Sequence, residues 1–443
     1  MYETSAEHTI QVHPVLTDAS KEAFLQRARL LGHDEGALLR GREEVSYFLL
    51  NTLEDIRNTL SVATPEQRKL RQKTFFNPPI EARARLGQGL HDRGESHTFA
   101  DGHVPAGDQH GIDNHLPLHV KAISVLHKVV PAGEVWDVSV RGEVWGLDNL
   151  EELYTTVNVG TLVLEPGASV VVRGNVFSLV CQQIICSSLT DECDYHIGIL
   201  PTPFSVDFRR GPIDGPAGAS GKHGAHGGDG EQALVENNLL GLALQQPIEP
   251  EEMCGVDGEN GEDGLPGVAG RNGGMCKLAE ITLRNVVDNV AVFVQAGKGG
   301  NGGNGGRGGD GGHGGDGRDG YQLITGLLPG GDGGNGGDGG NGGDGGHAGH
   351  GGVASNVYIN VPEEQKLRVC CTVLPSEGGA GGKGGKCGVG GGGGMAGQGP
   401  QPGRAGEDGQ AGKHGKKGKA GRSRPAPWVF INEQPITQSI NMF

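Results

Sequence analysis

The chain has 443 residues, a net charge of −16, and a composition of only 35% hydrophobic and 5% aromatic residues. This length allows two or three domains, and the acidic balance argues against a nucleic-acid partner, because a phosphate-binding surface needs clustered Lys and Arg. Of the 85 glycines, 16 precede residue 211, so the other 69 lie in residues 211–421, where no large apolar core can form.

Residues 1–77 are predicted to form an N-terminal helical segment. Apolar side chains recur there at spacings of three and four, and they include Phe24, Leu31, Tyr47, Phe48 and Leu53. The start of the chain has no basic region followed by an apolar run, so no signal peptide is visible. No stretch approaches the roughly 18 apolar residues of a membrane span. We therefore expect cytoplasmic synthesis, with an extracellular or particle-associated destination left open.

Residues 78–119 are predicted to be a polar, His-rich linker, because Pro and Gly interrupt them and they show no periodicity. Aspartates alternate with six histidines, and these are the candidate metal ligands: His91, His97, His103, His110, His115 and His119. Imidazole and carboxylate groups suit zinc or a similar divalent metal. The spacings match no defined site, so a polar surface loop is the alternative, and no other cofactor is indicated.

Residues 120–210 are predicted to form a β domain. Apolar residues alternate at 135–140, 161–164 and 169–172, with a turn at Pro166 and Gly167 between the last two. Short strands separated by glycine-containing turns are typical of a β-sandwich or a β-solenoid. The eight cysteines form no close C-x-x-C pair, which argues against structural zinc and leaves disulfides and buried thiols as alternatives.

Six glycine segments dominate residues 211–430, and we number them one to six in chain order. They span residues 215–230, 255–274, 297–320, 330–352, 378–399 and 403–421. Glycine at every third position matches the polyproline II helix, which has three residues per turn and no internal hydrogen bonds. A face without side chains leaves the backbone free to pair with a neighbouring segment. We therefore predict a bundle of about six polyglycine II helices, each on the order of 60 Å long.

The glycine segments are of two kinds. Segments three and four read Gly-Gly-X, so two of their three edges carry no side chain, and we expect them inside the bundle with their polar X positions solvated. Segments one, two and six read Gly-X-Y and belong on the outside. Apolar inserts between the segments, such as residues 279–283, 291–294 and 356–361, predict strand pairs gathered into sheets at the rod ends. Residues 431–443 are expected to be a C-terminal tail.

Three other structures compete with the bundle. The Gly-X-Y runs are short, interrupted and poor in proline, which argues against a collagen triple helix. Glycine-rich sequences are often flexible, but a strict phase kept through six segments argues against disorder. Residues 339–344 approach a calcium-binding nonapeptide, yet Gly346 stands where that motif needs a large apolar residue.

The alternation of Gly-Gly-X rods and strand inserts over residues 211–430 resembles polyglycine II bundles in three settings: the glycine-rich domain of Obg-type GTPases, the snow flea antifreeze protein, and the tip adhesins of some phage tail fibres. The chain has no GxxxxGK[ST] loop, so the first resemblance implies no GTPase activity. The polar X rows differ from the flat, weakly polar face expected of an ice-binding protein. The third resemblance implies recognition by loops at rod ends, such as residues 321–329 and 362–366.

Neither a GxSxG motif nor a cysteine in nucleophile-like surroundings is present, so the sequence predicts no enzyme. We expect a mostly β, polyglycine II protein that acts as a non-catalytic structural scaffold and self-associates into an oligomer, fibre or particle. The alternative is an adhesin that binds a surface receptor or glycan through the loops at the rod ends.

Overall fold

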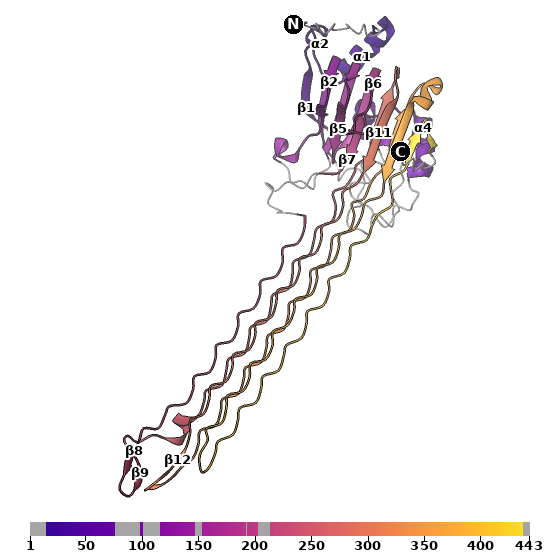
Figure 1. Cartoon of the computed structure of the whole chain (residues 1–443). Coiled ribbons are helices and arrows are strands. Elements are labelled where there is room, and N and C mark those ends of the chain that lie inside the picture. The colour runs from indigo at the N-terminus through magenta and orange to yellow at the C-terminus, as the bar shows by residue number, and fades with distance from the viewer. Residues whose placement is uncertain are drawn as a thin grey trace, which may run out of the picture.

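The computed structural model describes residues 15–75, 98–100, 116–146, 153–191, 193–202 and 213–436, and these are mostly β with few helices. Figure 1 shows three parts: a head that holds most of the strands, a long stalk made of the glycine segments, and a small tip at the far end of the stalk. No helix within the described ranges is both long and apolar enough to cross a membrane.

The head is built from stacked pairs of strands, each of which we call a rung. The first strand of a rung lies in an eight-stranded sheet, the second lies in a five-stranded sheet, and each strand pairs in parallel with its counterpart in the next rung. The five rungs are β2 (Leu118–Val130) with β3 (Val135–Asp137), β4 (Leu153–Leu164) with β5 (Ser169–Arg173), β6 (Val176–Cys186) with β7 (Ile197–Leu200), β10 (Ala279–Leu283) with β11 (Val290–Gln295), and β14 (Val357–Asn360) with β15 (Val369–Leu374). Strand β16 (Val429–Ile431) ends the parallel ladder, and β17 (Gln434–Pro435) turns back on it.

Apolar side chains from the two sheets form the core of the head. Every residue of β4 and β6 is buried, as expected for parallel strands that are covered on both faces. The core runs through all the rungs, from Ile123 to Ile431. Cys181 belongs to it, and burial raises the pKa of its thiol to about 12, so at neutral pH the group is an un-ionised thiol.

The N-terminal region packs on the outer face of the eight-stranded sheet, where α1 contacts β4 and β6. Its helices are α1 (Asp18–Leu30), α2 (Glu35–Leu39), α3 (Leu53–Leu60) and α4 (Pro65–Phe75). Thr17 caps α1 by accepting the Ser20 N–H, and Thr52 caps α3 by accepting the Asp55 N–H. These side-chain caps account for the positions at which the two helices begin.

One part of the helical prediction is wrong. Residues Glu44–Leu50 form strand β1, which pairs antiparallel with β2 at the edge of the eight-stranded sheet. Tyr47 and Phe48 fit a helical spacing in the sequence, but they also fit an alternating pattern, since exposed and half-buried residues alternate along β1. The unpaired edge of β2 provides a backbone partner that the local sequence does not reveal.

The glycine segments are long excursions between rungs. The second rung is joined to the third by a short turn between β5 and β6. After each later rung, the chain instead runs along the stalk and back before it re-enters the head. Segments one and two follow β7 and are joined at the tip by β8 (Val235–Asn238) and β9 (Gly241–Leu244). Segments three and four follow β11 and are joined by β12 (Tyr321–Leu323) and β13 (Gly326–Leu328), whereas segments five and six follow β15.

Backbone hydrogen bonds link the six segments into a strip two layers thick. Segment three bonds to segments one, two, four and five, and segment four bonds to segments two, three, five and six. Segments one and six lie at the two edges of the strip, and segments two and five lie next to the edges. The Gly-Gly-X segments three and four therefore occupy the interior, as their side-chain count predicts. Segment two has three neighbours and is less peripheral than its Gly-X-Y pattern suggests.

Candidate functional site

The polar X positions of the Gly-Gly-X segments accept hydrogen bonds from neighbouring segments. Asn304 Oδ1 accepts the Lys383 N–H at 2.8 Å, and Asp344 Oδ1 accepts the Lys416 N–H at 2.6 Å. The same contact recurs at other X positions, which are Asn301, Asp310, Asp316, Asp319, Asp332, Asn335, Asp338 and Asn341. The short side chains of Asp and Asn supply an oxygen for a backbone N–H that meets no carbonyl. The expectation that these rows are merely solvated is therefore wrong.

Histidines of the stalk make the same contact through Nδ1, which accepts a backbone N–H at 2.8–3.1 Å. They are His223, His226, His313, His347, His350 and His414. The rings of His226 and His313 also stack, with centroids 5.0 Å apart. A nitrogen that accepts a hydrogen bond carries no proton, so each of these imidazoles is neutral in this geometry, with its proton on Nε2.

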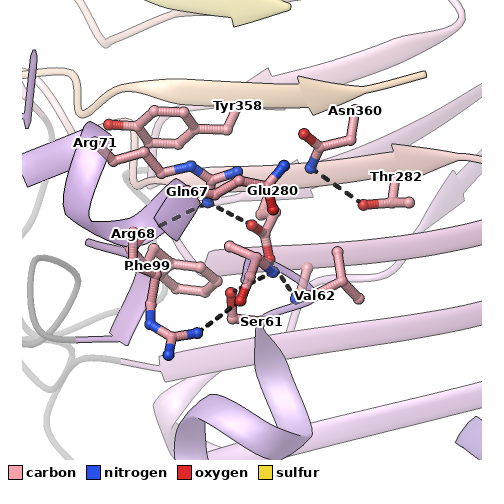
Figure 2. A network of polar contacts seen from close by, with 12 residues as sticks. Ser61, Val62, Gln67, Arg68, Arg71, Phe99, Glu280, Thr282, Tyr358 and Asn360 are labelled. Atoms are coloured by element: carbon pink, nitrogen blue, oxygen red, sulfur yellow. Dashed lines mark hydrogen bonds and ion pairs between the residues drawn. The ribbon is translucent and has the colours of Figure 1, made fainter. Parts of the chain in front are cut away.

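A buried ionic cluster joins distant parts of the head (Figure 2). Arg71 on α4 is completely buried, and its guanidinium bonds to Glu280 on β10 at 2.5 Å and to Glu433 at 2.6 Å. The guanidinium carbon lies 4.3 Å from the centre of the Tyr358 ring, and the second oxygen of Glu280 accepts the Val62 N–H at 2.9 Å. We call Arg71, Glu280 and Glu433 the clasp.

The clasp connects the N-terminal helices, the fourth rung and the C-terminal hairpin. Burial by itself would lower the pKa of Arg71, but the charges of Glu280 and Glu433 outweigh it and raise the pKa above its usual range. Glu433 has φ +64 and follows Asn432 with φ +49, so the turn between β16 and β17 is left-handed. A non-glycine residue in this conformation is uncommon, and here it carries a carboxylate that bonds to Arg71.

Only one of the six predicted metal ligands lies within the described residues. His91, His97, His103, His110 and His115 lie outside the described residues. His119 lies on β2, and its ring meets the edge of Trp145 at a centroid distance of 5.0 Å. Within the described parts of the chain, no three His, Cys, Asp or Glu side chains are grouped so that they could hold a metal ion. The metal site in the linker stays a prediction.

The tip is a small four-stranded sheet of two hairpins, in the order β13-β12-β9-β8. Its own core is formed by Ala233, Met253, Leu323 and Leu328. Residues 321–329, predicted as a rod-end loop, lie here, whereas residues 362–366 lie in the head, around a 3₁₀ helix at Glu363–Arg368.

Two exposed leucines stand at the turn of the β8–β9 hairpin. The register pairs Asn238 with Gly241, so Leu239 and Leu240 are the two turn residues, and their exposed fractions are 107% and 86%. Sequence reasoning missed this turn, although two leucines between Asn237-Asn238 and Gly241 are an unusual sequence for one. The β8–β9 hairpin lies at the far end of the stalk (Figure 1), and Leu239 is the most exposed large apolar side chain of the described residues.

No protein-family model, curated protein or solved structure that was compared with this chain matches it. What the protein does is therefore inferred from the geometry of the head, stalk and tip.

Proposed function

We propose that this protein is a non-catalytic structural scaffold, in which a polyglycine II bundle acts as a rigid spacer on a β-solenoid head. The observation that carries this proposal is the set of backbone hydrogen bonds linking each glycine segment to its neighbours along the stalk, for example the series from Gly215 to Gly230 that bonds segment one to segment three at 2.7–2.9 Å. Each bond contributes about 1 kcal/mol net, and the bonds act together because no segment can bend without breaking several of them.

The experiment that tests the spacer is negative-stain electron microscopy of the purified full-length protein. We expect particles with a compact head and a straight stalk of about 60–75 Å, from about 3.1 Å per residue over runs of 20 or more residues. Particles in which the stalk is bent at varied angles, or absent, would contradict a rigid spacer.

Self-association is part of the proposal, and strand β1 supports it. β1 is the outermost strand of the eight-stranded sheet in the described residues, and it exposes Val45, Tyr47 and Leu49 in one row. An edge strand with unpaired backbone groups and apolar side chains favours pairing with a second chain. Light scattering should show multimers that a Tyr47→Lys substitution disrupts. A monomer at every concentration would exclude assembly.

A second candidate function is that of an adhesin that contacts a surface receptor or glycan through the tip. It is favoured by Leu239 and Leu240, whose side chains have no partner within the described chain that would remove them from water. Binding of the labelled protein to cells should fall when the tip turn is changed and should persist when β1 is changed. The opposite result would favour the scaffold alone.

A further inference from the structure

The turn of the β8–β9 hairpin is unsuited to a purely structural role. Two-residue turns favour Asn, Gly and Asp, because these residues tolerate the backbone geometry and hydrogen-bond to water. Leu239 and Leu240 instead leave their full side chains in solvent. Ile324 of the neighbouring hairpin lies next to Gly241, the residue that follows the two leucines, since its Cγ1 is 3.3 Å from the Cβ position of Gly241.

The chain around this turn is predominantly negative, and Arg318, whose backbone N–H bonds to Met253 at the base of the tip, is paired with Asp229. Residues 231–253 contain five exposed glutamates and no lysine or arginine, and the second hairpin, residues 321–329, contains no charged residue. The glutamates are Glu231, Glu236, Glu249, Glu251 and Glu252. No Lys or Arg occurs between Lys222 and Arg271. The tip thus combines exposed apolar side chains with an excess of negative charge.

We propose that the Leu239–Leu240 turn inserts into an apolar pocket of a partner protein whose rim is basic. This inference rests on the adhesin function proposed above and names the chemistry of the partner. Burying the two leucines provides the affinity, and the glutamates pair with Lys or Arg around the pocket and set the orientation.

Charge complementarity selects this partner over two others. An anionic bilayer would repel the five glutamates, because membrane-binding loops combine apolar side chains with Lys and Arg. A second copy of the chain carries the same acidic tip, so two tips would repel each other on approach. A protein with a basic rim gains from both the apolar and the charged parts of the tip.

The test is a selection of random short peptides displayed on phage against the immobilised full-length protein. Enriched peptides should combine large apolar residues with Lys or Arg, and their binding should weaken as ionic strength rises. The double substitution Leu239→Ser/Leu240→Ser should weaken binding by at least about tenfold, from the apolar area that is no longer buried. Leu265→Ser is the matched control, because Leu265 is 59% exposed on the side of the stalk, and it should change nothing.

Four outcomes would overturn the proposal. These are enrichment of acidic or uncharged peptides, binding that survives the double substitution, no enrichment above the double variant, and leucine-dependent binding to vesicles of phosphatidylcholine with or without phosphatidylserine. The adhesin function is judged separately by binding to cells. Cell binding that needs the tip but shows no preference for basic peptides would retain the adhesin and remove the basic pocket.

Discussion

The head of this protein is stabilised mainly by its side chains, and the stalk mainly by its backbone. In the head, side chains such as Phe177 and Ile281 are removed from water between two sheets. In the stalk, side chains are absent from the contact faces, and the backbones lie so close that a Cβ added at Gly306 would be 1.9 Å from the Ala219 oxygen. The head is therefore stabilised by buried apolar side chains, and the stalk by backbone contacts that a side chain would block.

This contrast decides which substitutions each region tolerates. A core side chain can be exchanged for another of similar size at modest cost. An interior glycine of the stalk has no acceptable substitute, whereas outward X and Y positions accept many. Polar groups also differ, since the head buries them as a charged clasp and the stalk uses them as single acceptors along its surface.

The largest effect is expected at the clasp, where the head departs from its own reliance on apolar contacts. Arg71→Met removes the cation and leaves Glu280 buried without its ion pair. Breaking a buried pair costs about 3–5 kcal/mol, which urea denaturation would measure as a fall in the free energy of unfolding. Arg29→Met is the control, because Arg29 forms only exposed ion pairs, with Glu22 and Glu35, and exposed pairs contribute little to stability. Equal effects of the two variants would contradict the clasp.

The next effect tests the need for glycine inside the stalk. Gly306→Ala should separate segments one and three and destabilise the contact by about 2–4 kcal/mol, through overpacking and lost hydrogen bonds. Hydrogen exchange of the neighbouring amides should accelerate by about a hundredfold. Gly228→Ala is the matched control in segment one, since nothing lies within 4 Å of its Cβ position. Similar exchange in both variants would show that the segments are not held by close backbone contact.

The sequence predicts the stalk better than it predicts the head. Each backbone contact in the stalk requires a missing side chain, so the inner position of segments three and four is visible as a Gly-Gly-X period. The mostly β character of the chain is likewise predicted and confirmed. The parallel rungs could only be narrowed to a sandwich or a solenoid, because alternation of apolar residues does not reveal which strand lies next to which.

Contacts between residues far apart in sequence could not be predicted. Arg71 is separated from Glu280 by 209 residues and from Glu433 by 362, and no local pattern marks any of the three. The acceptor role of Asn304 depends on the register between segments three and five, which is set by the positions at which the chain leaves and re-enters the head. Until that register is known, a single polar residue between glycines is expected only to contact water.

One X position of segment three lacks an acceptor, and filling it is expected to stabilise the stalk, unlike the substitutions described above. Arg307 occupies an X position of segment three but has no acceptor atom, so the matching Lys386 N–H finds no acceptor in this row. Arg307→Asn should supply the acceptor and stabilise the stalk by about 0.5–1 kcal/mol, less the small loss of the exposed ion pair to Asp310. Exchange of the Lys386 amide should slow, whereas Arg307→Leu should leave it unchanged. No difference between these two variants would contradict the acceptor role.

Acid is expected to weaken the head through His196. Burial lowers the pKa of this histidine, although a hydrogen bond to the Ser187 carbonyl opposes the shift, and its Nδ1 accepts the Ala291 N–H at 3.0 Å. Because the folded-state pKa lies below the unfolded value, the unfolded state binds the proton first as the pH falls. Stability is therefore full above about pH 6.5 and declines below it. His196→Gln should flatten this decline in pH-dependent denaturation, and His127→Gln, at an exposed position of β2, should not.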